Sequence, residues 1–571
     1  MIRPVRPKFA LALAFSILLG AFSQLQTSAQ TPSASDSITF NKDIAPILFK
    51  NCAPCHRPGQ SAPFNLLTYS EAKKHAGGIA KATRTHYMPP WLPEAGCGEF
   101  MDERRLTAEQ IELIQDWVAA GAPEGRARDM PPPPNFAEGW LLGKPDLIVQ
   151  TPQAYVLAPE GADLYRNFVI PAPLLETRFV RAIEFHPRSR GVHHVRIKLD
   201  PTRQSRRLDE QDPEPGFPGM RTPGKFPPGH LLTWIPGKLP SIEPDGMQWV
   251  LEKDTDLVLQ IHLQRSGKAE QIQPEIGFYF TNQPPNANPY LIGLLAESID
   301  IPAGEKDHLI ERTFELPVGV DLLNVLPHLH YLGKQVQSFA TLPDGTQQCL
   351  LSIPNWDFNW QGEYRYRPPI FLPAHSKITM RLTYDNSAEN VRNPNHPIRR
   401  VTFGPQSTDE MGELWLQVLP RDPADLPALE KAHNQFRNLE TIAYYENQLR
   451  LNAGDSEVHT ALGKLLGPMG KLEPAIQHFQ AAIQLDPAQV EAHYYLGLSL
   501  YTIREWNDAQ EEFETALRLD PKHVKAHDAL GLLLLKLNKP AEAEAHFKRA
   551  IELNPEDAAA RNYLRGLDGK R

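Results

Sequence analysis

Short runs of alternating apolar and polar residues fill the middle of the chain, from about residue 145 to residue 420. Examples are DLVLQIHLQ at 256–264, KITMRLTYD at 377–385 and ELWLQVLP at 413–420. Alternation with a period of two is typical of half-buried strands, and the proline, glycine and asparagine between the runs predict turns. A polar, proline-rich stretch at 282–289 divides the region. We therefore expect two strand-built halves, at 145–283 and 288–420.

Both ends of the chain have helical patterns instead. Residues 38–125, within an expected domain at 36–125, are predicted to be mostly helical. The motif Thr107-x-x-Gln110 is typical of a capped helix start. The run MPPPP at 130–134 marks the boundary to the strands. After 421–427 the pattern is helical to the end of the chain. The expected fold class is therefore a multidomain α, β, α arrangement.

The C-terminal helices repeat with a period of 34 residues. The recurring positions are Gly463, Gly497 and Gly531, Phe479, Phe513 and Phe547, and Ala482, Ala516 and Ala550. The period and the order of small and aromatic residues resemble the tetratricopeptide repeat (TPR), in which small residues let paired helices approach closely. The resemblance implies an α-helical solenoid over 436–571 that binds a protein partner.

Composition narrows the functional classes. The 571 residues carry a net charge of −9, which argues against nucleic acid as the main partner. Four cysteines exclude a disulfide-dense scaffold, and 55 prolines favour loop-rich β domains. Twenty histidines invite a search for metal ligands.

The N-terminus has the layout of a secretory signal peptide. Three basic residues precede the apolar run FALALAFSILLGAF at 9–22, and small residues before position 30 predict cleavage after Ala29. The alternative, a membrane anchor, needs a run of about 20 apolar residues. We expect residues 1–29 to be removed, a periplasmic or secreted protein, and no membrane span after cleavage.

Cys52, Cys55 and His56 form a C-x-x-C-H motif, the pattern of covalent haem c attachment. The thiols can add to the haem vinyl groups and the histidine can ligate iron. The segment HYMPPW at 86–91 looks like the distal loop of small cytochrome c domains, which implies Met88 as the second axial ligand, with His86 and Met101 as alternatives. The other readings of the motif are a disulfide or half of a zinc site, but no further zinc ligands lie near it in sequence.

Histidines in the β region come in three groups, followed by a methionine. The groups are His193 with His194, His262, and His328 with His330, and the methionine is Met411. Residues i and i+2 of a strand share a face, so the H-x-H pair can reach one metal. The adjacent pair can do so only if the backbone bulges or turns, which Gly191 would help. Imidazole with a thioether suits copper.

The strings HHV, LQIHL, HLHYLGK and TDEM, in this order, resemble the copper type II, ascorbate-dependent monooxygenases, the family of peptidylglycine α-hydroxylating monooxygenase and dopamine β-monooxygenase. The resemblance covers about 145–420. It implies two antiparallel β-sandwiches and two copper ions facing each other across a solvent cleft. His193, His194 and His262 would hold the electron-transfer copper, and His328, His330 and Met411 the catalytic copper that activates O₂.

Other residues near these strings stay open. His230 is an alternative third ligand, and Gln260, Asp409 and Glu410 are candidates to orient the imidazoles. The aromatic-rich run at 354–360 is interpreted as core that also lines the cleft.

The family's many disulfides are absent, since only Cys97 and Cys349 remain beside the haem motif. These two could bridge the haem domain to the second β half or stay free. No residue set identifies the substrate.

The hypothesis is an exported copper-dependent monooxygenase that hydroxylates a C–H bond of a small molecule or peptide with O₂. Its own haem c would supply electrons to the copper bound by His193, His194 and His262, because both centres belong to one chain. The alternative is a non-enzymatic redox or copper-binding scaffold that recruits partners through its repeats.

Overall fold

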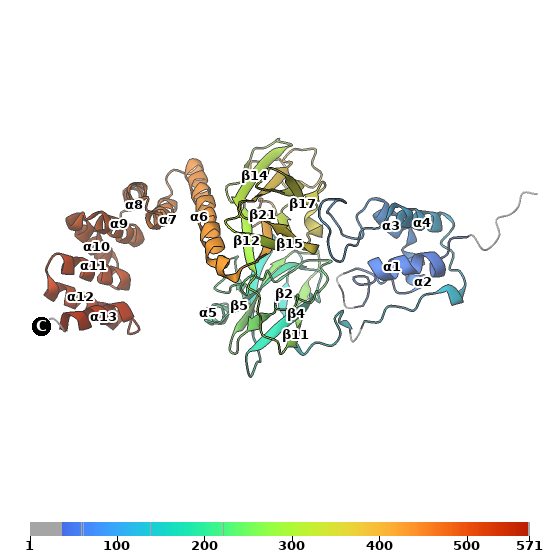
Figure 1. Ribbon diagram of the computed structural model, residues 1–571, viewed down its shortest axis with the longest axis horizontal. Helices are drawn as coiled ribbons and strands as arrows, with labels where there is room; N and C mark the ends of the chain where they lie inside the picture. The colour runs from blue at the N-terminus through green and yellow to red at the C-terminus, as the bar shows by residue number, and fades with distance from the viewer. Residues whose placement is uncertain (1–36, 59, 61, 137–138, 221, 569–571) are drawn as a thin grey trace, which may run out of the picture.

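The computed structural model describes residues 37–568 apart from 59, 61, 137, 138 and 221. Figure 1 shows a helical N-terminal region, a central body of β-sheets, and an arm of C-terminal helices on the opposite side of that body. The proposed signal peptide lies outside the described residues. Within the described part of the chain, no helix is both long and apolar enough to cross a membrane.

The N-terminal region has a small helical core and long loops. Its elements are η1 (Phe40–Ile44), α1 (Ala45–Asn51), α2 (Tyr69–Lys74), α3 (Ala76–Arg84), α4 (Ala108–Ala119) and η2 (Ala127–Asp129). The predicted capping box starts α4, with Thr107 and Gln110 each bonding the other's backbone. Trp117 of α4 and Phe40 are fully buried in the shared core. The region is less helical than predicted because residues 91–105 pack elsewhere.

The first β half is a sandwich of a five-stranded sheet, ordered β6-β3-β9-β5-β7, on a four-stranded sheet, ordered β1-β11-β4-β8. A short pair, β10-β2, lies beside them, and every pairing is antiparallel. The elements are β1 (Leu147–Gln150), β2 (Tyr155–Leu157), β3 (Leu164–Pro171), β4 (Arg178–His186), β5 (Val192–Asp200), α5 (Gln204–Gln211), β6 (Phe217–Pro218), β7 (Thr233–Trp234), β8 (Trp249–Leu251), β9 (Asp256–Leu263), β10 (Glu270–Ile272) and β11 (Glu275–Thr281). One apolar core takes side chains from both sheets, which is what period-two alternation produces.

The second half is also an antiparallel sandwich, with sheets ordered β12-β21-β15-β18 and β14-β19-β16-β17 and a short pair β13-β20. Its elements are β12 (Tyr290–Leu295), β13 (Asp300–Ile301), β14 (His308–Glu315), β15 (Val320–Leu329), β16 (Gly333–Thr341), β17 (Gln347–Ile353), η4 (Phe358–Trp360), β18 (Tyr364–Leu372), β19 (Lys377–Tyr384), β20 (Val401–Thr402) and β21 (Gly412–Pro420). The division at 282–289 falls between β11 and β12, as the sequence predicted.

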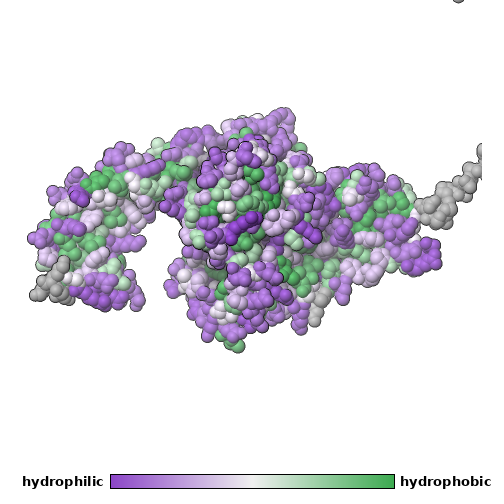
Figure 2. All heavy atoms as spheres, in the orientation of Figure 1, coloured by the Kyte–Doolittle hydropathy of each residue, from purple (hydrophilic) through white to green (hydrophobic). Residues whose placement is uncertain are grey.

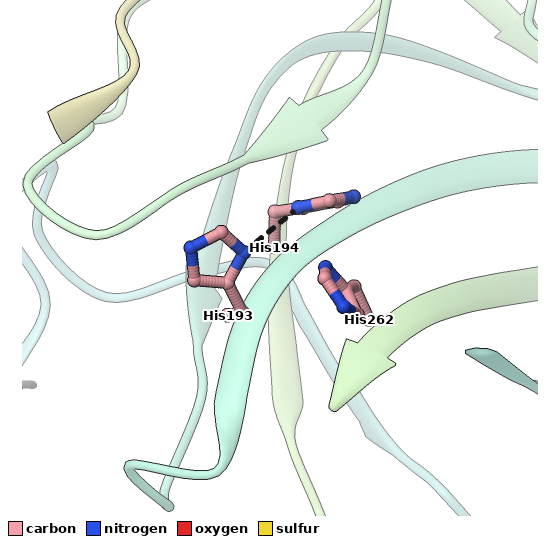
Figure 3. Close-up of side chains that lie close together, drawn as sticks. All are labelled: His193, His194 and His262. Atoms are coloured by element: carbon pink, nitrogen blue, oxygen red, sulfur yellow. Dashed lines mark hydrogen bonds between the residues drawn. The ribbon is translucent and has the colours of Figure 1, made fainter. Parts of the chain in front are cut away.

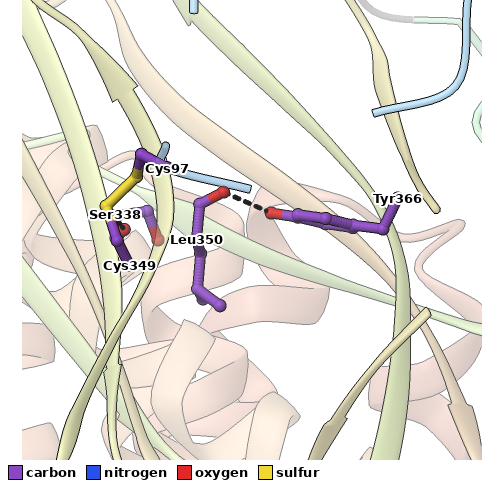
Figure 4. The surroundings of a disulfide bond; sticks show 5 residues. All are labelled: Cys97, Ser338, Cys349, Leu350 and Tyr366. Atoms are coloured by element: carbon purple, nitrogen blue, oxygen red, sulfur yellow. Dashed lines mark hydrogen bonds between the residues drawn. A yellow bond between two sulfur atoms is a disulfide. The ribbon is translucent and has the colours of Figure 1, made fainter. Parts of the chain in front are cut away.

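A disulfide between Cys97 and Cys349 ties the 91–105 segment to strand β17 of the second sandwich (Figure 4). Phe100 enters the core of that sandwich and forms a bridge with Tyr366. Tyr366 donates its hydroxyl hydrogen to the Leu350 carbonyl beside the disulfide. Of the two fates left open for the cysteines, the structure therefore has the bridge.

Helix α6 (Leu426–Leu451) joins the β body to the repeats. It begins ten residues before the predicted solenoid boundary at 436, and it packs on the second sandwich. His433 is buried between Tyr290 and the Gly293 backbone of β12, and Arg312 pairs with Glu440. The helix is therefore both a docking element and the start of the helical arm.

The repeats form three helix pairs and a final helix. They are α7 (Ser456–Leu466) with α8 (Leu472–Leu485), α9 (Val490–Ile503) with α10 (Trp506–Leu519), α11 (Val524–Lys536) with α12 (Pro540–Leu553), and α13 (Ala558–Asp568); η5 (Pro423–Asp425) and η6 (Gly467–Met469) are short turns. In each pair the recurring glycine lies against the recurring phenylalanine. A Cβ at Gly497 would be 2.7 Å from the Phe513 ring. Figure 2 shows the arm curving away and leaving a hollow beside the β body.

Candidate metal centre

His193, His194 and His262 converge at one end of the first sandwich (Figure 3). Strands β5 and β9 pair with a register shift between Val192 and His194, so His193 is the extra residue of a bulge. The bulge that the adjacent pair needed is thus present, and it turns both rings toward the His262 ring. Among the described residues, this is the only group of three or more His, Cys, Asp or Glu side chains close enough to share a metal.

The geometry of this set suits a metal ion. One ring nitrogen from each of the three side chains lies within 4.8 Å of the others. The Nδ1 atoms of His193 and His194 are 3.1 Å apart. Two nitrogens bound to one tetrahedral ion at about 2.0 Å stand about 3.3 Å apart, close to this separation.

His328 and His330 lie at the end of β15, with ring centroids 5.3 Å apart. Strand β15 pairs with β21 so that Leu329 is opposite Gly412, which brings Met411 next to His330. The Glu410 carboxylate accepts hydrogen bonds from the backbone N–H groups of both His330 and Met411. The H-x-H pair and the methionine backbone therefore come together from segments about 80 residues apart.

The two sets form one buried cluster. The ring centroids of His194 and His328 are 5.8 Å apart, and an ion pair between Arg196 and Glu413, at 3.2 Å, joins the sandwiches beside them. The Phe358 ring stacks on His193 at 4.5 Å and covers the cluster. All five histidines are at most 7% exposed. The expectation of two sites separated by a solvent cleft is therefore wrong for this arrangement, because the sandwiches close directly on each other.

Three of the imidazoles are oriented by an acceptor on one nitrogen. His262 Nε2 lies 3.1 Å from Asp163 Oδ2, and His328 Nδ1 lies 2.5 Å from Gln361 Oε1. His330 Nδ1 lies 3.2 Å from the Asp409 carbonyl. Such outer contacts fix the tautomer of a metal-binding histidine.

The opposite nitrogens of these rings have no partner. Buried atoms without a hydrogen bond are His262 Nδ1, His328 Nε2 and His330 Nε2. A buried, unpaired polar atom costs about 1–3 kcal/mol, so three in one cluster call for a ligand. The residues present therefore fit copper ions well.

Burial lowers the pKa of four imidazoles in the cluster. The pKa of His193 falls to about 3, chiefly through desolvation and then through the charge of neighbouring His262. Burial also lowers the pKa of His194, His328 and His330. These four rings are therefore neutral at physiological pH, which is the form that binds metal.

The structure corrects some of the orienting residues expected from sequence. Gln260 does not touch His262, because its amide bonds Asn167 and the Met220 carbonyl instead. Asp163 and Gln361 hold imidazoles but were missed, since each comes from a loop with no motif of its own. His230 lies outside the cluster, with its two nitrogens each 2.7 Å from a backbone carbonyl.

The C-x-x-C-H motif lines a cavity of about 250 Å³ between the N-terminal helices and the β body. The cavity brings together Cys52, Cys55, His56 and Met88. Neither of the other sixth-ligand candidates, His86 and Met101, is among the residues that line it. Met101 pairs instead through its backbone N–H with Arg365 of β18.

The residues of this cavity suit a covalent haem. His56 Nδ1 donates to the Phe64 carbonyl at 3.0 Å, which leaves Nε2 free for iron. Cys52 and Cys55 are not joined to each other, which departs from the disulfide reading of the motif. Burial raises the pKa of Cys52 to about 12 and also raises that of Cys55, so neither is a reactive thiolate.

Comparison with known proteins identifies only the C-terminal repeats. Family models described as TPR repeat and tetratricopeptide repeat match residues 463–503 and 499–558. The repeats of this region are therefore TPR repeats, as the 34-residue period predicted. A search of curated proteins gives no match.

The chain also resembles solved structures over about a fifth to a quarter of its length. MamA is 23% identical and covers 24% of this chain and 82% of its own, with a TM-score of 0.23. YrrB, a TPR protein with an unusual peptide-binding site, is 21% identical and covers 23% of this chain and 68% of its own, with a TM-score of 0.22. The first TPR domain of human RPAP3 is 23% identical to this chain, and the match covers 20% of this chain and 90% of that domain, with a TM-score of 0.20.

Proposed function

We propose that this protein is a copper-dependent oxidoreductase of the monooxygenase type. The observation that carries the proposal is the buried cluster of five histidines, in which three rings are held through one nitrogen and have no partner on the other. His193, His194 and His262 would hold one copper ion, and His328, His330 and Met411 the other. Bound copper supplies one-electron transfer and activation of O₂ for attack on a C–H bond.

The chain's own residues keep the ligands in place. Asp163, Gln361 and the Asp409 carbonyl each hold one imidazole nitrogen, so the rings need not reorganise when metal arrives. Phe358 excludes water from the cluster. Because the sites are closed over, substrate entry requires Phe358 to swing aside or the sandwiches to separate.

A haem c at Cys52, Cys55, His56 and Met88 would supply electrons to the copper cluster. The cavity that contains these residues lies against the β body, which supports a role in electron delivery. The proposal also places the protein in the periplasm or outside the cell. The Cys97–Cys349 bridge supports this location, since structural disulfides persist in oxidising compartments.

The second candidate is a non-enzymatic redox or copper-binding scaffold. The TPR repeats favour it, because such repeats are a protein-interaction module. The closed cluster is also compatible with copper that is held but not turned over. In both candidates the helical arm recruits a protein or peptide partner.

Oxygen uptake separates the two candidates. Copper-loaded protein is given a reductant and a panel of small-molecule and peptide substrates, beside Met411→Ala and the exposed control Met101→Ala. If the protein is an enzyme, O₂ consumption should depend on substrate and should be abolished by Met411→Ala. The copper bound by His193, His194 and His262 should remain in that variant. Copper bound in full without any substrate-dependent uptake would favour the scaffold.

A further inference from the structure

A four-residue segment, Phe358–Gln361, touches both histidine sets and the C-x-x-C-H cavity. Phe358 stacks on His193 with centroids 4.5 Å apart and lies 5.4 Å from His330. Gln361 binds the Nδ1 atom of His328. Between them, Trp360 lines the cavity that contains the cysteines and Met88. One short segment therefore adjoins both the histidine cluster and the cavity of the C-x-x-C-H motif.

Two further contacts connect the cavity with the histidine cluster and with Trp360. Val192 lines the same cavity and is bonded directly to His193, so the cavity wall continues into the first copper ligand set. On the other side, the Tyr87 ring packs edge-on against Trp360 with centroids 5.3 Å apart. Tyr87 directly precedes Met88. The junction is thus made of packed aromatic rings and covalent bonds.

We propose that Trp360, which lines the cavity and belongs to the same short segment as Phe358 and Gln361, couples a haem bound at Cys52 and Cys55 to copper bound by His193, His194 and His262. The inference rests on the function proposed above and names the residue that connects its two parts. In the coupled step, ferrous haem loses one electron and becomes ferric, and cupric copper gains it and becomes cuprous. No bond is broken and no proton moves. Trp360 is a positioning residue, since it sets the packing between the two centres.

The test is electron exchange in full-length protein carrying haem and cupric copper. Haem is reduced by a light flash under argon, and its reoxidation is followed by absorbance together with loss of the cupric EPR signal. We expect Trp360→Leu to slow the exchange by about tenfold or more, as when a contact that positions reacting groups is lost. Trp360→Phe, which keeps an aromatic ring, should restore most of the rate.

Trp506→Leu is the matched control, because Trp506 is also a tryptophan but lies in α10 of the helical arm and does not line the cavity. It should leave the exchange rate unchanged. An unchanged rate in Trp360→Leu, with both metals bound, would overturn the inference. Exchange that depends on Trp360 in a protein without substrate-dependent O₂ uptake would uphold the inference and overturn the proposed enzyme. Protein that binds no copper would overturn both.

Discussion

His194 of the first sandwich and His328 of the second lie with their ring centroids 5.8 Å apart. Each belongs to a different predicted copper set, so the two sets meet directly at the interface between the sandwiches. The ion pair between Arg196 and Glu413 crosses the same interface. The closeness of the two rings makes the two histidine sets one cluster rather than two remote groups.

Asp163 should control the copper affinity of the first set. Its carboxylate holds the Nε2 atom of His262, and loss of such an outer contact lowers metal affinity by about 10–100-fold. We expect Asp163→Ala to raise the copper dissociation constant by this factor in a chelator competition. Asp245→Ala, in an exposed loop, should not change it. Equal affinities for the two variants would contradict the role of Asp163.

Docking of α6 should weaken in acid because of His433. The Gly293 N–H donates to its Nε2, which requires a neutral ring, and burial with the nearby Arg437 charge lowers its pKa from 6.5 to about 4. The other groups facing it are the Tyr290 hydroxyl, the Gly293 carbonyl and, through Arg437, Glu297. His433 binds a proton more readily when the helix is released than when it is docked. The docking of α6 is therefore most stable above pH 6.5, and it loses at most about 3 kcal/mol as the pH falls from 6.5 to 4.

Hydrogen exchange along α6, measured between pH 4 and pH 7, checks this dependence after correction for the intrinsic exchange rate. In His433→Gln the side chain cannot titrate, so the change in protection over this range should largely disappear. The same pH dependence in His433→Gln and in the unaltered protein would assign it to other groups.

The recurring glycines should set the stability of the repeats. Valine at Gly497 would force the Phe513 ring to move, and such overpacking costs about 1–3 kcal/mol. We expect Gly497→Val to lower the unfolding temperature of the helical arm and to leave the β body unchanged. Gly566→Val is the control, because a Cβ at Gly566 meets no atom within 4 Å. Equal losses in both variants would mean that the close helix contact is not the cause.

The Cys97–Cys349 bridge should stabilise the body by holding the 91–105 segment on the second sandwich. Replacing both cysteines by serine should lower the free energy of unfolding by about 2–4 kcal/mol in denaturant titrations without reductant. With reductant present, the variant and the unaltered protein should have the same free energy of unfolding. A difference that persists in reductant would point to the serines themselves.

The parts of the fold predicted from sequence are those with a local period. Alternation of period two gave the strands, the 34-residue step gave the repeats, and adjacent His193 and His194 implied the bulge that β5 contains. The partners Asp163 and Gln361 could not be found this way, since only tertiary folding brings their loops to the histidines. The closeness of His194 and His328 also depends on how two sandwiches dock, which no local pattern encodes.

The aromatic run at 354–360 shows the same limit. Its composition indicated core, and Trp356 is indeed 1% exposed. The separate contacts of Phe358 with the histidines and of Trp360 with the cavity depend on the turn of η4 and on the docking of the N-terminal region. Composition predicted burial, but not which groups these rings would contact.

The most direct test of the copper centre is the number of copper ions per chain after loading and desalting, measured by elemental analysis beside His262→Ala and His328→Ala. The two-site arrangement predicts two ions in the unaltered protein and one in each variant, with different EPR spectra from the remaining ion. No stoichiometric copper, or the same content in all three proteins, would contradict it.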